Sequence, residues 1–349
     1  MNSTDSLTTY AGAIHIHTKC SDGSGSLREI VKAAQKCHLD FIVITDHNTV
    51  GYLKHGKEGF YDNLFVLIGE EVTHHKGHCL ALNISESVAP INGNPLLYLK
   101  EIKRQKGLSF IAHPHLNTNP VFRIKNISWR DWSLNSYTGI EIWSYMTDWA
   151  QNLRVGNFYT HCQRPDRFIS GPFFPTLRKW DELCRERRVV AIGGVDAHAR
   201  HILPWGLKKI FPYDMLFKTV LTYVITPTLP RDDFALSKKL FYEALSRGRC
   251  FVANIKHGDA RSFEYKCIFP DGRTLLQGDE AAYEDGVYIT INLPGRATIR
   301  MIHNGSIVAE KKDKSLLHKP TTDGSYRVEI YLDNKPWIFS NQIYLRRLE

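Results

Sequence analysis

Histidine and carboxylate side chains recur at short spacings in this chain, and these residue types hold divalent metal ions in proteins. Ten of the 16 histidines lie within residues 1–115. His15 and His17 stand two positions apart after a short apolar run, and Asp196 and His198 repeat that spacing much later. On a strand, residues i and i+2 point to the same face, so we expect each pair to reach one centre.

More potential ligands lie between the two pairs, several of them at the ends of predicted strands. They are Asp22, His47, Glu71, His78 and His113. A single histidine is more often an ordinary hydrogen-bonded residue, but nine imidazoles and carboxylates together exceed the needs of one closed structural zinc site, and no cysteine pair accompanies them. The pattern therefore predicts an open cluster of two or three divalent ions with bridging carboxylates.

The elements that must position these residues follow from apolar periodicity. Buried strands are predicted at 12–16, 41–44, 64–69, 79–84, 108–112, 138–142 and 189–193. Helices are predicted after Ser26, near 95–106 and near 176–187, and Ser26 with Glu29 has the spacing of a capping box. Strands that alternate with helices favour a parallel α/β barrel or open sheet. The carboxyl ends of barrel strands meet at one mouth.

Two segments depart from this rhythm. Residues 115–175 carry four tryptophans and read as a long irregular insertion, either a lid or a hydrophobic cluster that covers one end of the barrel. After Gly258 the residues alternate between apolar and polar, and Asn304-Gly305 and Asp323-Gly324 are turn signals, which predicts an antiparallel β-sandwich. We expect a barrel domain at 1–257 and a small all-β domain at 258–349.

Composition excludes several classes of protein. The chain has 349 residues, of which 43% are hydrophobic, so it is not a disordered chain. It has no uninterrupted apolar run of the ~18 residues that a membrane helix needs, and its polar N-terminus does not resemble a secretory signal. Seven scattered cysteines favour reduced thiols and a cytoplasmic protein. Oligomeric state is not readable.

The formal net charge of +9 lies in one stretch of the chain. Residues 121–257 hold 21 Lys and Arg against 12 Asp and Glu, whereas the segments on either side are neutral. The basic residues are dispersed rather than in a run, so they form either a solvated surface or a positive wall that faces a site. The second interpretation favours a small anionic ester as substrate over nucleic acid, which remains a minor option.

The motifs together resemble those of the PHP (polymerase and histidinol phosphatase) metallohydrolases. The matching segments, in the family's order, are His15-x-His17-Thr18 with Ser21-Asp22-Gly23, Ile44-Thr45-Asp46-His47-Asn48-Thr49, Gly69-Glu70-Glu71-Val72-Thr73, Gly77-His78, Ala112-His113-Pro114 and Gly194-x-Asp196-Ala197-His198. The resemblance implies a distorted TIM-like (β/α)7 barrel that binds up to three metals, with manganese, iron and zinc as the usual candidates.

Position by position, the resemblance implies nine metal ligands. They are His15, His17, Asp22, His47, Glu71, His78, His113, Asp196 and His198. Glu70 is adjacent to Glu71 and competes with it for one position. The segment Gly139-Ile140-Glu141-Ile142-Trp143 and the end of the β domain are similar to the carbaryl-hydrolase-like (CehA/McbA type) branch, whose name refers to an aryl carbamate substrate.

The function expected from these residues is metal-dependent hydrolysis, most simply of a small phosphomonoester or phosphodiester by a metal-bridged water. Catalytic candidates are Asp22, His198, His115 and Asp46, and substrate-binding candidates are Arg154, Arg200, His201 and Lys208. Asp46, His115 or His201 could protonate the leaving group. The alternatives are a hydrolase of carbamate, ester or amide bonds and a non-catalytic metal-binding module.

Overall fold

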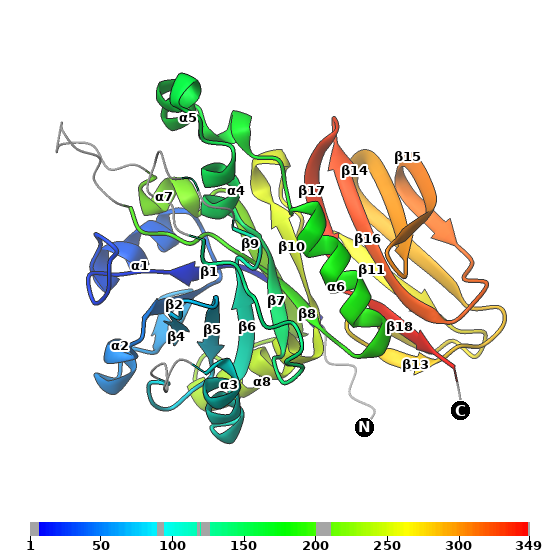
Figure 1. The fold of residues 1–349 in the computed structure, drawn as a ribbon. Helices are drawn as coiled ribbons and strands as arrows, with labels where there is room; N and C mark the ends of the chain where they lie inside the picture. Colours follow the sequence, from blue (N-terminus) through cyan, green and yellow to red (C-terminus); the bar gives the residue numbers. More distant parts are fainter. Residues whose placement is uncertain (1–6, 89–93, 117–118, 120–125, 200–210, 348–349) are drawn as a thin grey trace. The chain divides into compact units, whose positions relative to one another are not determined.

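A computed structural model of the chain describes residues 7–88, 94–116, 119, 126–199 and 211–347 (Figure 1). The residue contacts divide the chain into two compact units. Unit 1 comprises Met1–Tyr10, Leu177–Ala191 and Thr222–Glu349, and unit 2 comprises Ala11–Thr176 and Ile192–Leu221. All nine candidate ligands belong to unit 2. These units group residues by contact and do not test a domain boundary at 257/258, which stays a prediction.

The elements of unit 2, some of which extend into unit 1, alternate as the apolar pattern predicts. The strands are β1 (Leu7–Ile16), β2 (Phe41–His47), β3 (Gly59–Tyr61), β4 (Leu64–Val72), β5 (His78–Leu82), β6 (Leu108–Ala112), β7 (Gly139–Ser144) and β8 (Val190–Gly194). The helices are α1 (Leu27–Lys36), α2 (Gly51–Lys54), α3 (Pro95–Arg104), α4 (Tyr145–Gln151), α5 (Phe158–Gln163) and α7 (Tyr213–Leu216), and α6 (Phe174–Glu186) belongs mostly to unit 1. Every strand and helix predicted for residues 12–193 is present.

Helix α1 shows how local sequence signals define these elements. The Ser26 hydroxyl accepts a hydrogen bond from the Glu29 backbone, and the Glu29 side chain accepts one from the Ser26 backbone, so the predicted capping box forms. The helix buries one face, made of Leu27, Ile30, Val31 and Ala34. The capping box and the apolar face both place the start of the helix after Ser26, so the sequence was sufficient to predict it.

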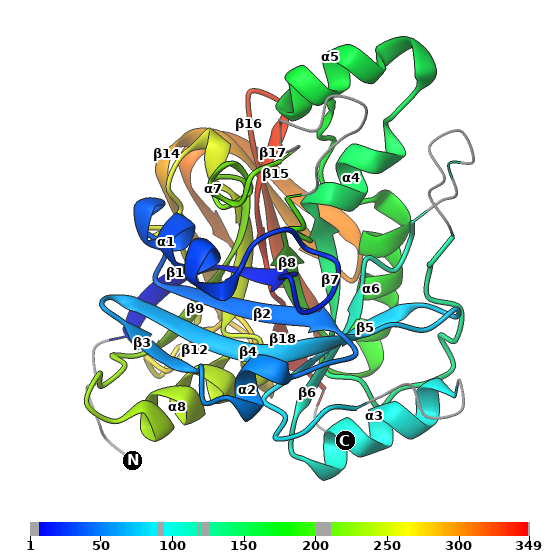
Figure 2. The same cartoon turned by 90° about the vertical axis from the view of Figure 1, so that its left-hand side faces the viewer.

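The sheet of unit 2 is mixed rather than parallel, which corrects the expected uniform β/α repeat. β1 pairs in parallel with β2, β2 with β4, and β6 with β7, but β5 runs antiparallel to both β4 and β6. Figure 2 shows β2, β4 and β5 side by side. Residues 73–77 alone connect β4 to β5, too few for the helical crossover that parallel strands need. A closed TIM barrel is not confirmed.

The segment at 115–175 is less irregular than predicted. Its described part contains β7, α4 and α5, with 3-10 turns at Val155–Asn157 and Pro165–Phe168. Helix α4 begins directly after β7, where the Ser144 side chain caps its first turn by accepting a hydrogen bond from Thr147. The buried Asp148 carboxylate accepts hydrogen bonds from the Trp143 indole and from the backbone of Ser170 and Gly171. These contacts fold the segment onto itself.

Unit 1 is rich in strands. They are β9 (Val220–Pro227), β10 (Cys250–Asn254), β11 (Glu264–Ile268), β12 (Thr274–Leu276), β13 (Glu280–Ala282), β14 (Tyr288–His303), β15 (Ser306–His318), β16 (Gly324–Leu332), β17 (Lys335–Ser340) and β18 (Ile343–Arg346). Helix α8 (Phe234–Arg247) and a 3-10 turn at Ile255–His257 precede β11. From 258 to 347 the only regular elements are strands, as the alternating pattern predicts. Whether they pack as a sandwich stays a prediction.

The two predicted turn pairs behave differently. Asn304 and Gly305 have φ of 47° and 84° and join β14 to β15 as a two-residue hairpin, the conformation that this pair favours. Asp323 and Gly324 instead lead into β16, which pairs with β14. The second pair therefore ends a connection and does not form a hairpin turn.

A buried ion cluster lies within unit 1. The Arg327 guanidinium donates to both oxygens of Asp181, at 2.7 and 2.8 Å, and to Glu329 at 2.6 Å. Burial alone would lower the pKa of Arg327, but the two carboxylates raise it above its usual range. The guanidinium and the two carboxylates are buried together, and each depends on the others for compensation.

No helix among the described residues combines the length and apolar character needed to cross a membrane.

Candidate metal centre

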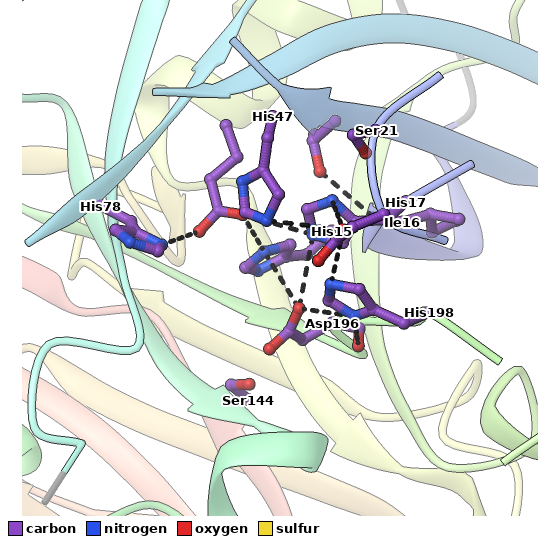
Figure 3. A network of polar contacts seen from close by, with 12 residues as sticks. His15, Ile16, His17, Ser21, His47, His78, Ser144, Asp196 and His198 are labelled. Atoms are coloured by element: carbon purple, nitrogen blue, oxygen red, sulfur yellow. Dashed lines mark hydrogen bonds and ion pairs between the residues drawn. The ribbon is translucent and has the colours of Figure 1, made fainter. Parts of the chain in front are cut away.

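The two His and Asp pairs meet because residues 195–197 run alongside residues 14–17. Ile16 and Ala197 form a parallel bridge, the Val195 amide donates to the Ile14 carbonyl at 3.0 Å, and the His17 amide donates to the Ala197 carbonyl at 2.9 Å. Figure 3 shows the side chains of His15, His17, His47, Asp196 and His198 gathered in one place. Residues about 180 positions apart thus share one centre.

Simple alternation along a strand does not orient the first pair, which corrects the sequence argument. The β1–β2 register shifts between Ile14 and Ile16, and His15 lies in this irregularity with φ of 70°. His113 and Asp196 also have positive φ, of 28° and 52°. Such backbone is uncommon outside glycine, costs about 1–3 kcal/mol per residue and tends to gather at functional sites.

The Glu71 carboxylate lies at the middle of the centre. Its Oε2 atom is 3.2 Å from the Nε2 atoms of both His15 and His17 and 3.1 Å from His47 Nδ1. Its Oε1 atom is 2.7 Å from His78 Nδ1 and 3.1 Å from His113 Nε2. One carboxylate cannot accept hydrogen bonds in good geometry from five rings at once, so this crowding points to shared ions.

All nine candidate ligands fall into four overlapping groups whose ligand atoms lie within 4.8 Å of one another. We call His15, Glu71 and His113 the inner triad, and His17, Asp22, His47 and His198 the outer quartet. Asp196 joins His15 and His17 in a third group, and His78 joins His47 and Glu71 in a fourth. The inner triad and the outer quartet share no residue, whereas the other two groups link them.

The remaining carboxylates bracket the rings. Asp196 Oδ1 is 3.4 Å from the Nε2 atoms of His15 and His17 and 3.4 Å from His198 Nδ1. Asp22 Oδ1 is 3.1 Å from His198 Nε2 and 3.6 Å from His47 Nε2. Two ligands about 2.1 Å from one tetrahedral ion lie roughly 3.4 Å apart, so these separations suit shared coordination.

The donor atoms fit divalent metal ions. His15 Nε2, both ring nitrogens of His17 and His113 Nδ1 are buried without a hydrogen-bond partner. Buried polar atoms are normally satisfied, so these orphaned nitrogens call for a partner such as an ion. A neutral imidazole offers one lone pair, so His17, with Nε2 near Glu71 and Nδ1 3.8 Å from Asp22, can serve only one ion.

Without any bound ion, burial and neighbouring charges already shift the pKa values of several of these ligands strongly. Burial would raise the pKa of Glu71, but His15, His78 and His113 hold it well below its usual range. Burial would lower the pKa of His17, yet Asp196 and Glu71 raise it to about 9. His47 differs, because burial outweighs the nearby carboxylates and lowers its pKa to about 4. Strong opposite shifts in one cluster are a common mark of functional sites.

The ambiguity between Glu70 and Glu71 is resolved by strand alternation. Glu70 accepts hydrogen bonds from the Ser87 hydroxyl, at 2.6 Å, and from the Val88 amide, while Glu71 faces the five imidazoles. Adjacent residues of β4 point to opposite faces of the sheet. Glu71 is therefore the one that the structure brings into the centre.

Asp46 lies beside the centre but is fully engaged. Its Oδ1 atom accepts from the Thr18 amide at 2.7 Å and from the Ser21 hydroxyl at 2.6 Å, and its Oδ2 atom accepts from the Thr18 hydroxyl at 2.7 Å. These contacts hold the loop that carries Asp22, so the geometry suits positioning better than proton donation.

The other predicted catalytic and substrate residues are less closely tied to the cluster. His115 Nδ1 lies 2.9 Å from the Thr176 hydroxyl, and its ring stacks on Trp132 with centroids 5.6 Å apart. The Arg154 guanidinium donates to the carbonyls of Gln151 and Leu153. Arg200, His201 and Lys208 lie outside the described residues.

Sequence reasoning missed two supporting residues. Glu141, on β7, accepts hydrogen bonds from His15 Nδ1 and from the His113 amide, both at 2.8 Å. Tyr213, on α7, donates its hydroxyl to the His17 carbonyl at 2.8 Å and accepts from the Gly25 amide. The one available signal was a lone carboxylate within the apolar run of a predicted buried strand.

Comparison with known proteins supports a PHP domain. Residues 13–116 match the model of the PHP domain family. This matched segment contains seven of the nine candidate ligands, from His15 to His113, whereas Asp196 and His198 lie beyond it. The matched residues do not reach the β domain, so membership of the carbaryl-hydrolase-like branch stays a prediction.

Individual relatives are distant. An uncharacterized protein of Methanocaldococcus jannaschii is 32% identical over 114 residues, which span 29% of this chain and 66% of that protein. A two-domain protein from Bacteroides vulgatus, described as containing a predicted PHP-like metal-dependent phosphoesterase, is 15% identical with a TM-score of 0.44, covering 96% of this chain and 95% of its own. A Bifidobacterium adolescentis protein, named provisionally as a metal-dependent phosphoesterase, is 15% identical with a TM-score of 0.34, covering 59% and 93%.

Proposed function

We propose that this protein is a metal-dependent hydrolase whose reaction takes place at the centre around Glu71. The observation that carries the proposal is the position of the Glu71 carboxylate within 3.2 Å of five imidazole nitrogens, beside buried nitrogens that have no hydrogen-bond partner. The PHP domain match over residues 13–116 supports the same conclusion.

Two or three ions would be held by the nine ligands, with Glu71 shared between the inner triad and its neighbours. Imidazole and carboxylate donors suit zinc, iron and manganese. When bound, such ions supply a Lewis acid for a substrate oxygen and an activated water as nucleophile. The carboxylates of Asp22, Glu71 and Asp196 would offset only part of the positive charge of the ions. The positive charge that remains would attract an anionic substrate.

Protein groups around the centre have separate tasks. Asp46 holds the loop that carries Asp22, and the Thr73 hydroxyl, 2.6 Å from His47 Nδ1, orients that ring. His198 and Asp22 lie at the part of the centre that is open to solvent, with side chains 18% and 38% exposed, and would meet the substrate first. His115 is a better candidate than Asp46 for the proton donor, because both carboxylate oxygens of Asp46 already accept hydrogen bonds from Thr18 and Ser21.

The substrate class that we propose is a small anionic ester, a phosphomonoester or phosphodiester. The +9 charge supports this class, since it lies wholly in residues 121–257. Arg200, His201 and Lys208 remain proposed contacts for the anion. Arg154 is the weakest of the four, because its guanidinium already donates to two backbone carbonyls.

A second candidate is a hydrolase of aryl carbamates, esters or amides with the same centre. One observation favours it: Trp132 stacks on His115 at an interplanar angle of 20°, and both side chains are half-buried. A planar aromatic group could extend such a stack. A neutral carbamate would gain nothing from the positive charge, so this candidate ranks second.

The test compares three substrates on the purified protein after loading with manganese: p-nitrophenyl phosphate, bis-p-nitrophenyl phosphate and 1-naphthyl methylcarbamate. We expect turnover of a phosphoester, and none in His17→Ala or Asp196→Ala, both of which should still fold. Carbamate turnover alone would favour the second candidate. Full phosphoester turnover by either variant, or less than one ion per wild-type chain, would overturn the proposal.

A further inference from the structure

Glu141 is a buried carboxylate that contacts two of the nine ligands without being one of them. It lies on β7 and is 1% exposed. Its Oε1 atom is 2.8 Å from His15 Nδ1, and its Oε2 atom accepts from the His113 amide at 2.8 Å. Both oxygens are thus engaged by the two histidines of the inner triad, so Glu141 is not itself free to act as a ligand.

The hydrogen bond to His15 sets the protonation of that ring. Glu141 Oε1 accepts this hydrogen bond from the ring N–H, which places the ring proton on His15 Nδ1. The lone pair then lies on Nε2, which is 3.2 Å from Glu71 and 3.4 Å from Asp196. This atom is buried and has no hydrogen-bond partner. A neutral His15 held in this way offers its lone pair to an ion and cannot turn the wrong nitrogen toward it.

The hydrogen bond from His113 holds a strained backbone. His113 and His15 have φ of 28° and 70°, and Glu141 contacts both. The same carboxylate therefore stabilises two residues in backbone conformations that they would not adopt unaided. The chain also leaves room for it: a side chain at Gly194 would overlap the Glu141 carboxylate.

We propose that Glu141 is the positioning residue of the inner triad, and that it fixes the tautomer of His15 and the orientation of His113 so that the triad retains its ion. The inference rests on the proposed metal centre. It predicts a selective effect, because Glu141 contacts two members of the inner triad, whereas the outer quartet has its own supports in Asp46 and Thr73.

Glutamine cannot replace Glu141, although it has the same shape. If its amide oxygen accepts from His15 Nδ1, its NH2 group faces the His113 amide, and two donors meet. In the opposite orientation the NH2 group donates to His15 Nδ1, which forces the ring proton onto Nε2 and removes the lone pair. Either arrangement weakens the inner triad.

The experiment compares wild type, Glu141→Gln and the matched control Glu70→Gln, which alters an equally buried glutamate that faces away from the centre. Metal per chain is measured over a titration with manganese or zinc. Separately, a pH titration of the metal-free proteins followed by 15N NMR reports the tautomer that the His15 ring adopts once it is neutral. We expect Glu141→Gln to bind one ion about 10–100-fold more weakly and to shift the His15 tautomer, with the other ions unchanged.

Each outcome decides a separate question. A wild type that binds no metal refutes the proposed function, while the tautomer measurement still tests the role of Glu141. A wild type that binds metal, with Glu141→Gln matching it in affinity and tautomer, overturns this inference alone, as does an equal effect in Glu70→Gln. If the glutamine variant does not fold, Glu141→Asp keeps the charge but withdraws both oxygens by one methylene, and the same selective loss is expected.

Discussion

The inner triad and the outer quartet use the same chemistry in different surroundings. His15, Glu71 and His113 are 0%, 1% and 4% exposed, and Glu141 forms hydrogen bonds with both histidines. In the outer quartet the side chains of His198, His47 and Asp22 are 18%, 24% and 38% exposed, and only His17 is buried. A buried ion with fixed ligands exchanges slowly, whereas an exposed one is accessible to solvent and substrate. We therefore expect the inner triad to retain its ion and the outer quartet to expose its ion to substrate.

The largest expected effect comes from breaking the inner triad. We expect His15→Ala to lower hydrolysis by more than ~100-fold, beyond the effect typical of outer-shell partners, because Nε2 is lost from a site that water cannot fill in the same geometry. Added metal should not restore activity. The measurement is kcat with and without excess manganese, and recovery to near wild-type rates would contradict the distinction between the two groups.

Asp22→Asn tests the outer quartet by the same assay. The amide keeps an oxygen but loses the charge, so we expect activity to fall by about 10–100-fold and to recover in part when metal is added. Metal analysis should show the inner ion still bound. If this variant loses every ion at once, the two groups are not independent and the comparison fails.

Chelation of the wild type sharpens the comparison without any substitution. We expect the metal to leave in two phases, first from the partly exposed outer quartet and then from the buried inner triad. Each bound ion present at 100 times its Kd stabilises the fold by ~2.7 kcal/mol, so the melting temperature should fall stepwise with metal content. A single phase, followed by metal analysis and calorimetry on the same samples, would show one cooperative cluster.

A smaller effect is expected from Asp46→Asn. The amide places an NH2 group among donors from Thr18 and Ser21 and leaves at least one unpaired, at about 1–3 kcal/mol. The loop that carries Asp22 should loosen, which weakens metal binding at the outer quartet by roughly 10-fold through that ~1–3 kcal/mol while the inner triad is unaffected. Ser21→Ala, which removes one of the three donors, is the milder control.

The smallest effect on the centre is expected from the ion cluster of unit 1. Arg327→Met leaves Asp181 and Glu329 buried without their cation, which should lower the free energy of unfolding by about 3–5 kcal/mol. Metal content and kcat should stay at wild-type levels below the melting transition. A change in metal stoichiometry of the folded variant would show that the centre depends on this ion cluster of unit 1.

Much of the fold was predictable where neighbouring residues carry the signal. The capping box at Ser26 and Glu29 predicted the start of α1, and the pair Asn304 and Gly305 predicted the turn between β14 and β15. The direction of β5 was not predictable from its own apolar run, because a strand has the same pattern whichever way it runs. Only the short connection before it decides between the two.

The candidate site divides in the same way. The spacing of the histidines and aspartates by itself determined which residues could bind metal, since ligand chemistry is a property of side-chain type. The tertiary structure alone decided that Glu71 rather than Glu70 faces the rings, that a bulge orients His15, and that Asp46 supports a loop. It also recruited Glu141, which lies 126 positions from His15. A hydrogen bond between strands so far apart leaves no local pattern, because it depends on how the sheet aligns them.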